Sequence, residues 1–404
     1  AFYDSRAPQI EQKAAAVDNA RFSHLRPVFE NQSLSGIWDV SWKYADNLSF
    51  ENKLVYTNFG NNRVGVYGNT IPSASIDGDE IVIEPLTRFR GLSDRLRGLA
   101  GLRYFQSGQD EKVTNLQPNP VSTYTFRDET KTSSAFTELT YALFPQIDVT
   151  MAGRFEEEQR YRVGRNGNGN RSVDFDKTFN AFLPKLDVAW KPDDAQTYGA
   201  KVARGFNAGG AGVTFTSGNN YVYDEEYVWN YELYTRHRLA GNRVELTSNL
   251  FYNDYEDYQL PYTVSAGNIE VRNLAKVVTY GLEVGARWKA TSDLDVFGSG
   301  GLLETKIEDA FAGYDVTGNH LPRAPKHTAT LGAKWMFAED FDLAGNVSYT
   351  GKYMSAVDND LRGKIDPSFL ANVELGYNFD AGRAALFAKN LFDSENELLI
   401  YSND

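Results

Sequence analysis

Apolar and polar side chains alternate along most of this chain with a period of two, in runs of ten or more residues. In one such run, Val149, Met151 and Phe155 fall on one face of an extended chain. Arg154 and Glu156 fall on the opposite face of the same run. A period of two over this length predicts a β-strand with one dry face and one wet face.

Short turns interrupt the alternating runs at nearly even intervals, and a longer polar segment lies between each turn and the next. The turns lie at Ala45–Asn47, Leu92–Asp94, Phe144–Gln146, Pro192–Asp194, Ala240–Asn242, Thr291–Asp293, Ala338–Asp340 and Asp380–Gly382. A strand of ten residues, rising about 3.3 Å per residue and tilted near 45°, crosses a bilayer core. The order of short turn, strand, long loop and strand predicts an all-β, antiparallel up-and-down transmembrane β-barrel.

A soluble β-sandwich or β-helix is the alternative fold class, because its strands also alternate. Those strands are usually about five or six residues long, and neither fold requires short turns to alternate with long loops. We therefore favour the barrel, and the alternation assigns side chains to its two faces. The residues expected to face lipid are Val149, Met151, Phe155, Leu343, Val347, Leu375 and Tyr377. The residues expected to face the lumen are Arg154, Glu156, Asn346, Lys352 and Glu374.

The composition agrees with a barrel once half of each strand is expected to face water. The chain has 404 residues, a formal charge of −13 and no cysteine. No apolar run approaches the roughly 20 residues of a transmembrane helix, which excludes a helical membrane protein. Aromatic residues gather near strand ends, where interfacial girdles form. The acidic balance argues against nucleic acid as a partner.

Segments in several strands carry a family resemblance. They are SSAFTELTYAL (133–143), KLDVAWKPDDAQTYGAKVARGFNAGG (185–210), EEYVWNYELYTRHRLAGNRVELTSNLFYNDYEDYQ (225–259), LPRAPKHTATLGAKW (321–335) and RAALFAKNLFD (383–393). In this order they resemble the barrel of bacterial TonB-dependent outer-membrane receptors. The resemblance implies a 22-stranded barrel with an N-terminal plug and a TonB box.

Aligning the NLFD segment with the family's penultimate strand makes about sixteen strands visible here, the sixth to the twenty-first. We expect residues 34–393 to form barrel, and residues 394–404 to begin the last external loop. Residues 1–33 are expected to be an extracellular loop or strand remnant, with a short helix over Gln9–Phe22. The plug, the TonB box, a signal peptide and the closing strand are expected to lie outside this sequence. A fragment of a longer protein is favoured over sixteen strands that close as a porin-like barrel.

The resemblance implies that the protein imports a scarce solute across the bacterial outer membrane, with ferric siderophores as the family's commonest substrate class. The implied partners are the TonB–ExbB–ExbD energy-coupling complex, reached through the plug, a small-molecule ligand, and outer-membrane lipid with lipopolysaccharide. The alternative is a passive porin, or a barrel that anchors a larger assembly. The sequence contains no catalytic constellation, so we expect no enzyme, and we expect no cofactor or metal site. The four histidines are scattered and form no metal-binding spacing.

Tyrosines near the long segments are the candidate ligand-binding residues, because a phenol combines apolar area with a polar tip. They are Tyr221, Tyr223, Tyr227, Tyr255, Tyr258 and Tyr262. For each one taken singly, packing in a girdle or loop is the commoner role.

Other polar motifs are interpreted as structural. We interpret the acidic groups Glu156–Glu158 and Asp224–Glu226 as solvated strand ends rather than cation sites. Gly205–Gly210 is expected to contain glycines with positive φ where the strand leaves the membrane. Gly164–Arg171 is expected to be a flexible loop tip. The long polar segments, such as 106–131 and 257–275, are expected to be external loops.

Overall fold

The computed structural model describes residues 28–64, 71–116, 122–214, 217–265, 268–310 and 315–400. The strands are β1 (Val28–Ala45), β2 (Leu48–Val64), β3 (Ile71–Gly91), β4 (Leu96–Leu116), β5 (Ser122–Phe144), β6 (Ile147–Asn166), β7 (Arg171–Asp193), β8 (Gln196–Asn207), β9 (Gly210–Val213), β10 (Asn220–Tyr223), β11 (Glu226–Leu239), β12 (Val244–Ser265), β13 (Asn268–Lys289), β14 (Leu294–Asp309), β15 (His327–Ala338), β16 (Phe341–Thr350), β17 (Tyr353–Met354), β18 (Lys364–Ile365), β19 (Ser368–Phe379) and β20 (Gly382–Ala388). Within these ranges the one helical element is a single 3-10 turn, η1 (Leu361–Gly363). No helix in the described part of the chain is long and apolar enough to span a membrane.

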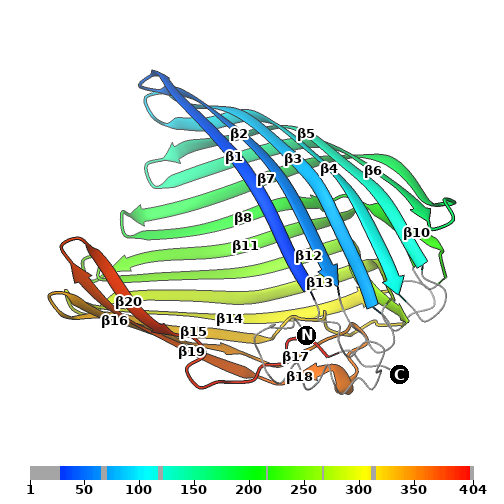
Figure 1. Ribbon diagram of the computed structural model, residues 1–404. Helices are drawn as coiled ribbons and strands as arrows, with labels where there is room; N and C mark the ends of the chain where they lie inside the picture. The colour runs from blue at the N-terminus through cyan, green and yellow to red at the C-terminus, as the bar shows by residue number, and fades with distance from the viewer. Residues whose placement is uncertain are drawn as a thin grey trace.

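Sixteen of the strands form one antiparallel sheet in which each strand pairs with its neighbours in sequence. Figure 1 shows this sheet curling around a central space, with the short turns at one end and the longer connections at the other. All eight predicted short turns lie between consecutive strands of this sheet. The predicted antiparallel up-and-down architecture is therefore confirmed.

The sheet is open along one side. Among the described residues, β1 pairs with β2 and β20 pairs with β19, and no ladder joins β1 to β20. Figure 1 shows a wide gap between these two edge strands. The described strands thus do not close into a sixteen-stranded porin.

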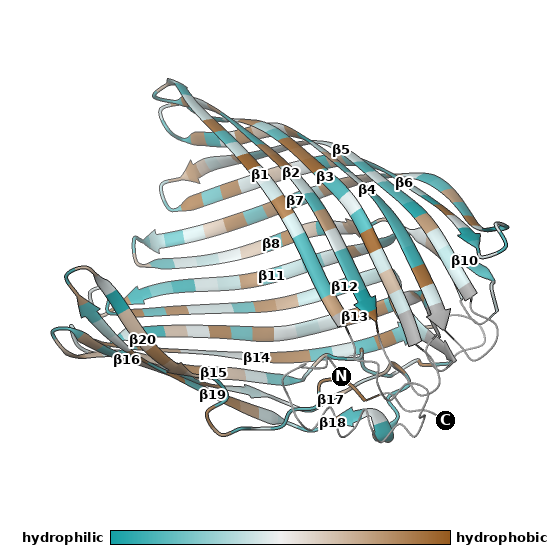
Figure 2. Cartoon of the chain, in the orientation of Figure 1, coloured by the Kyte–Doolittle hydropathy of each residue, from teal (hydrophilic) through white to brown (hydrophobic). Residues whose placement is uncertain are grey.

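The two faces of the sheet differ as the alternation predicts. On the outward face, Met151 is 61% exposed and Phe155 is 52% exposed. On the inward face, the Glu156 side chain is 13% exposed and forms an ion pair with Arg154. Figure 2 shows apolar and polar residues alternating along the strands. The other predicted outward residues, Leu343, Val347, Leu375 and Tyr377, are also exposed. Lys352 lies beyond the end of β16, so the prediction that it occupies a lumen-facing strand position is wrong.

Aromatic rings form rows on the outward face near the short turns. The Tyr198 ring lies 5.3 Å from Trp190 and 5.2 Å from His237, measured between ring centroids. A second row includes Phe341 and Tyr377, whose ring centroids are 4.7 Å apart. Rows of this kind are typical of the girdle at a membrane interface.

Several strands are much longer than a bilayer requires. β5 and β7 each have 23 residues, whereas about ten cross the apolar core. Most of the segments 106–131 and 257–275 are paired strand, so the prediction that they are loops is wrong there. Segment 106–131 is mostly polar and shows little alternation. In 257–275, Tyr258, Leu260 and Tyr262 do alternate with polar residues, so a strand could have been predicted there.

The ends of the barrel region also differ from prediction. β1 begins at Val28, so the barrel starts six residues before residue 34, within the segment that was expected to be a loop or strand remnant. β20 ends at Ala388 and a turn follows it, whereas barrel was expected as far as residue 393. The expected helix over Gln9–Phe22 lies outside the described residues.

The assignment of faces is testable at two neighbouring positions in β16. Val347 is outward, 46% exposed and near the middle of its strand, whereas Asn346 is inward and near Ser348. We expect Val347→Arg to lower the free energy of unfolding by roughly 2–4 kcal/mol, because a cation at the bilayer midplane is poorly solvated. Asn346→Arg should cost much less. Urea unfolding in lipid vesicles measures both, and equal costs would contradict the assigned register.

Candidate ligand-binding mouth of the barrel

The connection between β8 and β11 folds back into the barrel instead of extending away from it. Its strands β9 and β10 pair as a hairpin. The hairpin contacts both β7 and β13, which are separated in the sheet by β8, β11 and β12. It therefore crosses the inner surface of three strands near the long-connection end. We call this segment, residues 208–225, the inner hairpin.

One side of the inner hairpin is held by apolar packing. Ala208 and Val213 are 2% and 6% exposed and join a buried cluster with inward-facing residues of the wall. The wall residues of this cluster are Tyr124, Phe126, Val173, Phe175 and Phe179. Burying a valine or phenylalanine side chain stabilises by about 1.5–3 kcal/mol. The cluster therefore fixes the hairpin to β5 and β7.

The base of the inner hairpin is held by side-chain amides from β12 and β13. The Gln259 Nε2 donates to the carbonyl oxygens of Ala208 and Asp224, at 3.0 Å each. The Asn273 Nδ2 also donates to the Asp224 carbonyl at 3.0 Å, and the Asp224 N–H donates back to Asn273 Oδ1 at 2.8 Å. These bonds satisfy backbone groups that the sheet ladder leaves unpaired.

A further polar contact lies at the far end of the inner hairpin. The Thr214 hydroxyl donates to the buried carboxylate of Glu270. Although burial acts to raise it, the pKa of Glu270 is held below its usual value by hydrogen bonds from Thr214 and Arg272. The hairpin is thus anchored to β13 at its base and near its tip.

The glycines of Gly205–Gly210 serve close packing rather than an unusual backbone. None of them has a positive φ, so that prediction is wrong. A Cβ at Gly209 would strike the carbonyl oxygen of Tyr223, which belongs to the opposite strand of the hairpin. Just beyond this stretch, a Cβ at Gly212 would strike the ring of Tyr221. Glycine is needed here because the two strands and their tyrosine rings approach the backbone closely.

Charged side chains near the inner hairpin neutralise one another. Arg162 bonds to Asp128 at 2.8 Å and to Glu111 at 3.0 Å, and its guanidinium lies over the Phe126 ring. Burial raises the pKa of Asp128, while Arg162 opposes that shift.

The acidic groups singled out in the sequence also have partners. Lys177 bonds to Asp224 at 3.0 Å and to Glu225 at 3.4 Å. Glu226 accepts a hydrogen bond from the Gln259 N–H at 2.6 Å, and burial raises the pKa of Glu226. No group of three metal-ligating side chains occurs among the residues described. Glu156 and Glu158 are ion-paired in the middle of β6, so the prediction that Glu156–Glu158 is a solvated strand end is wrong. Asp224–Glu226 does lie at a strand end, where β11 begins.

A second buried cluster closes another part of the mouth. It joins the inner surface of β12–β14 to the β14–β15 and β16–β19 connections. Its members are Leu260, Leu274, Val277, Ile307, Val316, Leu321 and Val357. Tyr255 and Tyr258 pack against it with their ring centroids 5.2 Å apart. Burial raises the pKa of Tyr258 to about 12, so its phenol stays protonated at ordinary pH.

The two connections in this cluster are also joined by hydrogen bonds. The Asn359 Oδ1 accepts from the His320 N–H at 2.8 Å, and its Nδ2 donates to the His320 carbonyl at 2.9 Å. The Thr305 Oγ1 accepts from the Leu321 N–H at 2.9 Å. These connections form a packed cap with its own core.

The six candidate tyrosines do not converge on one site. Tyr221 and Tyr223 lie on β10 of the inner hairpin, and Tyr255 and Tyr258 lie in the second cluster. The remaining two sit beside arginines. Tyr227 lies on the outward face at the long-connection end of β11, with the Arg204 guanidinium 4.0 Å from its ring centroid, and Arg272 lies 4.5 Å from the centroid of Tyr262.

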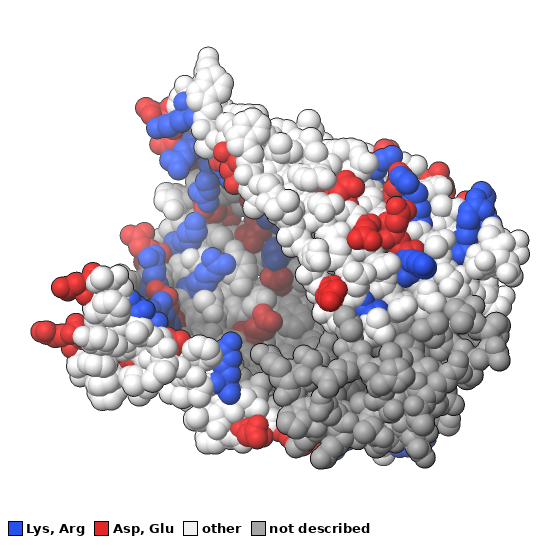
Figure 3. All heavy atoms as spheres, in the orientation of Figure 1, with Lys and Arg blue, Asp and Glu red and all other residues white. Residues whose placement is uncertain are grey.

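The inner wall also contains a charged recess that was not predicted from the sequence. This cavity of about 400 Å³ is lined by Arg103, Phe105, Ser107, Thr130, Thr132, Arg154, Glu156, Glu158 and Arg160. Each arginine has a glutamate partner, as in the Arg160–Glu158 pair at 2.6 Å and the Arg103–Glu84 pair at 3.3 Å. Figure 3 shows Lys and Arg beside Asp and Glu inside the open side of the molecule. The recess could have been predicted from β6, where every second residue from 154 to 162 is charged.

Comparison with known proteins identifies the architecture. The family model described as TonB dependent receptor-like, beta-barrel matches residues 3–391. The ferric yersiniabactin uptake receptor FyuA from Yersinia pestis superposes with a TM-score of 0.80 at 19% identity, over 94% of this chain and 58% of that one. The siderophore receptor PiuA from Acinetobacter baumannii gives a TM-score of 0.75 at 14% identity, over 91% of this chain and 61% of that one.

A third solved structure has a similar fold. The copper transporter OprC gives a TM-score of 0.70 at 13% identity, over 92% of this chain and 61% of that one. At such identities these likenesses show the fold alone, and the chain spans about three fifths of the length of each. The family model covers almost the whole chain and agrees with the sixteen-stranded antiparallel sheet. The chain therefore belongs to the TonB-dependent receptor family and forms part of its outer-membrane β-barrel.

Proposed function

We propose that this barrel takes part in energy-coupled import of a small solute, with ferric siderophores as the first class to test. The observation that supports import over passive diffusion is the match to the TonB-dependent receptor family over residues 3–391. The inner hairpin, which is fixed across the inner surface of the mouth from β7 to β13, supports a shaped binding site. A fixed and shaped mouth is what selective capture requires.

The choice of ferric siderophores as the substrate class is based on the solved proteins of similar fold. FyuA is named as a ferric yersiniabactin uptake receptor and PiuA as a siderophore receptor. OprC is named as a copper transporter, so a metal ion is the second candidate cargo. Tyr221 and Tyr223 remain candidate ligand contacts, because they lie on the hairpin within the mouth.

In this proposal, other strands of the full-length protein complete the sheet that is open at β1 and β20. The unpaired edges of β1 and β20 would leave rows of backbone donors and acceptors in lipid, at several kcal/mol for each group. We infer that further strands of the same protein pair with both edges, and that a plug fills the lumen against the charged recess. The TonB–ExbB–ExbD complex would act on that plug.

Uptake measurements distinguish import from passive diffusion. In cells that express the full-length protein, we expect accumulation of radiolabelled ferric catecholate, ferric hydroxamate or ferric citrate, or of copper. Accumulation should stop when an uncoupler abolishes the proton-motive force. Uptake that continues unchanged with the uncoupler would contradict import and favour the porin alternative.

The amide anchors of the inner hairpin provide a second test. Gln259→Ala combined with Asn273→Ala leaves the Ala208 and Asp224 carbonyls without these donors, at about 0.5–1.5 kcal/mol for each hydrogen bond lost. We expect faster proteolysis within residues 208–225 and a roughly ten-fold or greater loss of ligand affinity, since about 1.4 kcal/mol corresponds to ten-fold.

Asn58→Ala is the matched control for this double variant. The Asn58 Nδ2 also donates to a backbone carbonyl, that of Gly78, but it lies on β2 away from the hairpin. This control should bind ligand as the unaltered protein does. Unchanged proteolysis and unchanged affinity in the double variant would show that the hairpin is not held by these amides.

A further inference from the structure

Lys177 is shared by two acids at the base of the inner hairpin. Its ammonium lies 3.0 Å from the Asp224 carboxylate, 3.4 Å from that of Glu225 and 4.6 Å from the centroid of the Phe179 ring. One cation therefore serves two carboxylates and an aromatic face. The Asp224 side chain is 72% exposed, so its negative charge is open to a solute in the mouth.

Arg162 on β6 has the same kind of surroundings. Its guanidinium bonds to Asp128 and Glu111, and it lies 4.2 Å from the centroid of the Phe126 ring. The Arg162 Nε has no hydrogen-bond partner among the described residues, but that atom is buried. With their carboxylates ionised, the Arg162 group and the Lys177 group each carry one net negative charge.

The other inward-facing charges of the described strands near the inner hairpin do not reverse this balance. Arg160 bonds to Glu158 at 2.6 Å, and Arg272 bonds to Glu270 at 3.0 Å. By register, the basic residues of this set are Arg63, Arg160 and Arg272, and the acidic residues are Glu80, Glu158, Glu226 and Glu270.

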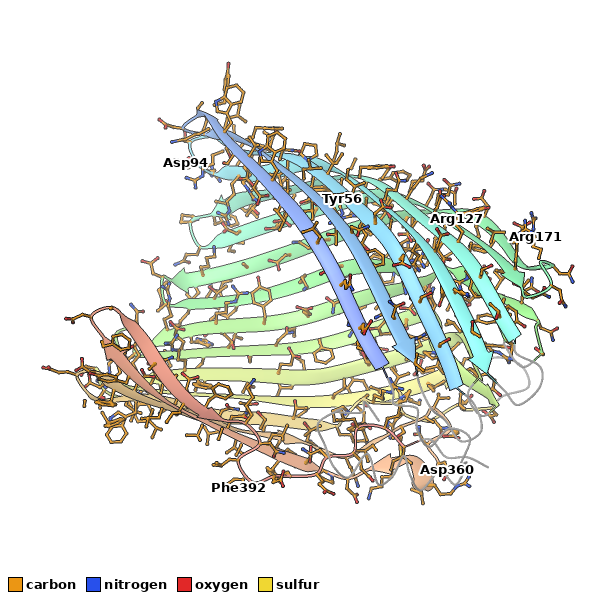
Figure 4. The ribbon with its side chains drawn as sticks, viewed as in Figure 1. Tyr56, Asp94, Arg127, Arg171, Asp360 and Phe392 are labelled. Atoms are coloured by element: carbon orange, nitrogen blue, oxygen red, sulfur yellow. The ribbon has the colours of Figure 1, made fainter. Side chains whose placement is uncertain are left out.

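The cap and the rim add no net positive charge either. The basic residues of the β14–β15 and β16–β19 connections are Arg323, Lys326, Lys352, Arg362 and Lys364, and they are matched by Glu304, Asp315, Asp358, Asp360 and Asp366. At the tip of the β6–β7 hairpin, Arg171 is paired with Asp174. Figure 4 labels Asp360 on the cap and Arg171 on this tip.

The inner hairpin itself contains only acidic charges. Residues 208–225 include Asp224 and Glu225 and neither lysine nor arginine. A cleft lined by an excess of one sign of charge focuses its potential and raises the local concentration of solutes of the opposite sign. The mouth therefore repels anions, and the basic groups beside the hairpin are already paired with acids.

We propose, on the basis of the import function proposed above, that the mouth selects ferric chelates without net negative charge. The acids at the base of the hairpin favour a chelate that carries a positive group, with Asp224 as the contact. Three catecholates leave a ferric complex with three negative charges, whereas three hydroxamates leave it neutral. A ferric trihydroxamate with a free amine is therefore the class that fits this mouth, and a ferric triscatecholate is the class that it rejects.

Three ferric complexes test this selectivity by isothermal titration calorimetry of the purified full-length protein in detergent. They are a linear trihydroxamate with a free terminal amine, the same trihydroxamate with that amine acetylated, and a triscatecholate. We expect the affinity to fall in this order. Raising the ionic strength should weaken binding of the amine complex and leave binding of the acetylated complex unchanged, because salt screens only the charged one.

Variants at the hairpin base assign the effect to named charges. Asp224→Asn combined with Glu225→Gln should weaken binding of the amine complex roughly ten-fold, because two charges at a distance on the order of 10 Å each contribute a few-fold at an effective dielectric constant of about 40. Binding of the acetylated complex should not change. Lys177→Gln should strengthen binding of the amine complex, which misfolding cannot do. Asp46→Asn is the matched control and should change nothing, because Asp46 pairs with Lys43 at 2.8 Å at the short-turn end of the barrel.

The outcomes separate this inference from the import function. Tightest binding of the triscatecholate, or an equal loss for both trihydroxamates in the double variant, would overturn the charge selectivity and leave import in place. If none of the three complexes binds and cells show no energy-dependent uptake of any of them, both the selectivity and the siderophore function are overturned.

Discussion

The structure depends on one constraint, which is that backbone donors and acceptors in a membrane must find partners within the protein. Next-neighbour antiparallel pairing meets this constraint with the shortest connections, and it accounts for the order of the sixteen strands. Because every strand is paired through its backbone, the side chains are free to differ between the faces. The outward face can then be apolar while the inward face carries ion pairs.

The same pairing supports the mouth. The strands continue well beyond the apolar core, and their inner surfaces present both aromatic and charged groups to the connections. The inner hairpin packs on β7 through Val213 and is bonded to β12 and β13 through Gln259 and Asn273. The β14–β15 and β16–β19 connections bury a core of their own. A rigid wall therefore organises connections that would have no fixed shape in isolation.

The sequence predicted what is encoded locally. Turns such as Ala45–Asn47 and Asp380–Gly382 combine small or acidic residues with flanking alternation, so both the hairpins and the faces could be predicted. The inner hairpin could not be predicted, because Phe126 and Val213 meet only after the sheet has curved. No local pattern distinguishes such a contact from a solvated loop.

The positions of the candidate tyrosines likewise could not all be predicted from local alternation. Tyr255 and Tyr258 are three residues apart and would point to opposite faces of a regular strand. Asp257 has a φ of 54°, which interrupts the strand and brings both rings to one cluster. Tyr227 followed the ordinary alternation and lies outside with Phe206. A single irregular backbone angle therefore changed which tyrosines are buried.

The inner hairpin also has a mechanical consequence. A thin cylindrical wall bends easily, since neighbouring strands can rotate about their shared hydrogen bonds without breaking them. By connecting β7 to β13 across three intervening strands, the hairpin acts as a brace along a chord of that curved wall. This sector resists flattening, so the curvature of the wall and the shape of the opening are set together. Deformation under load is then directed to the strands that lie outside the braced sector.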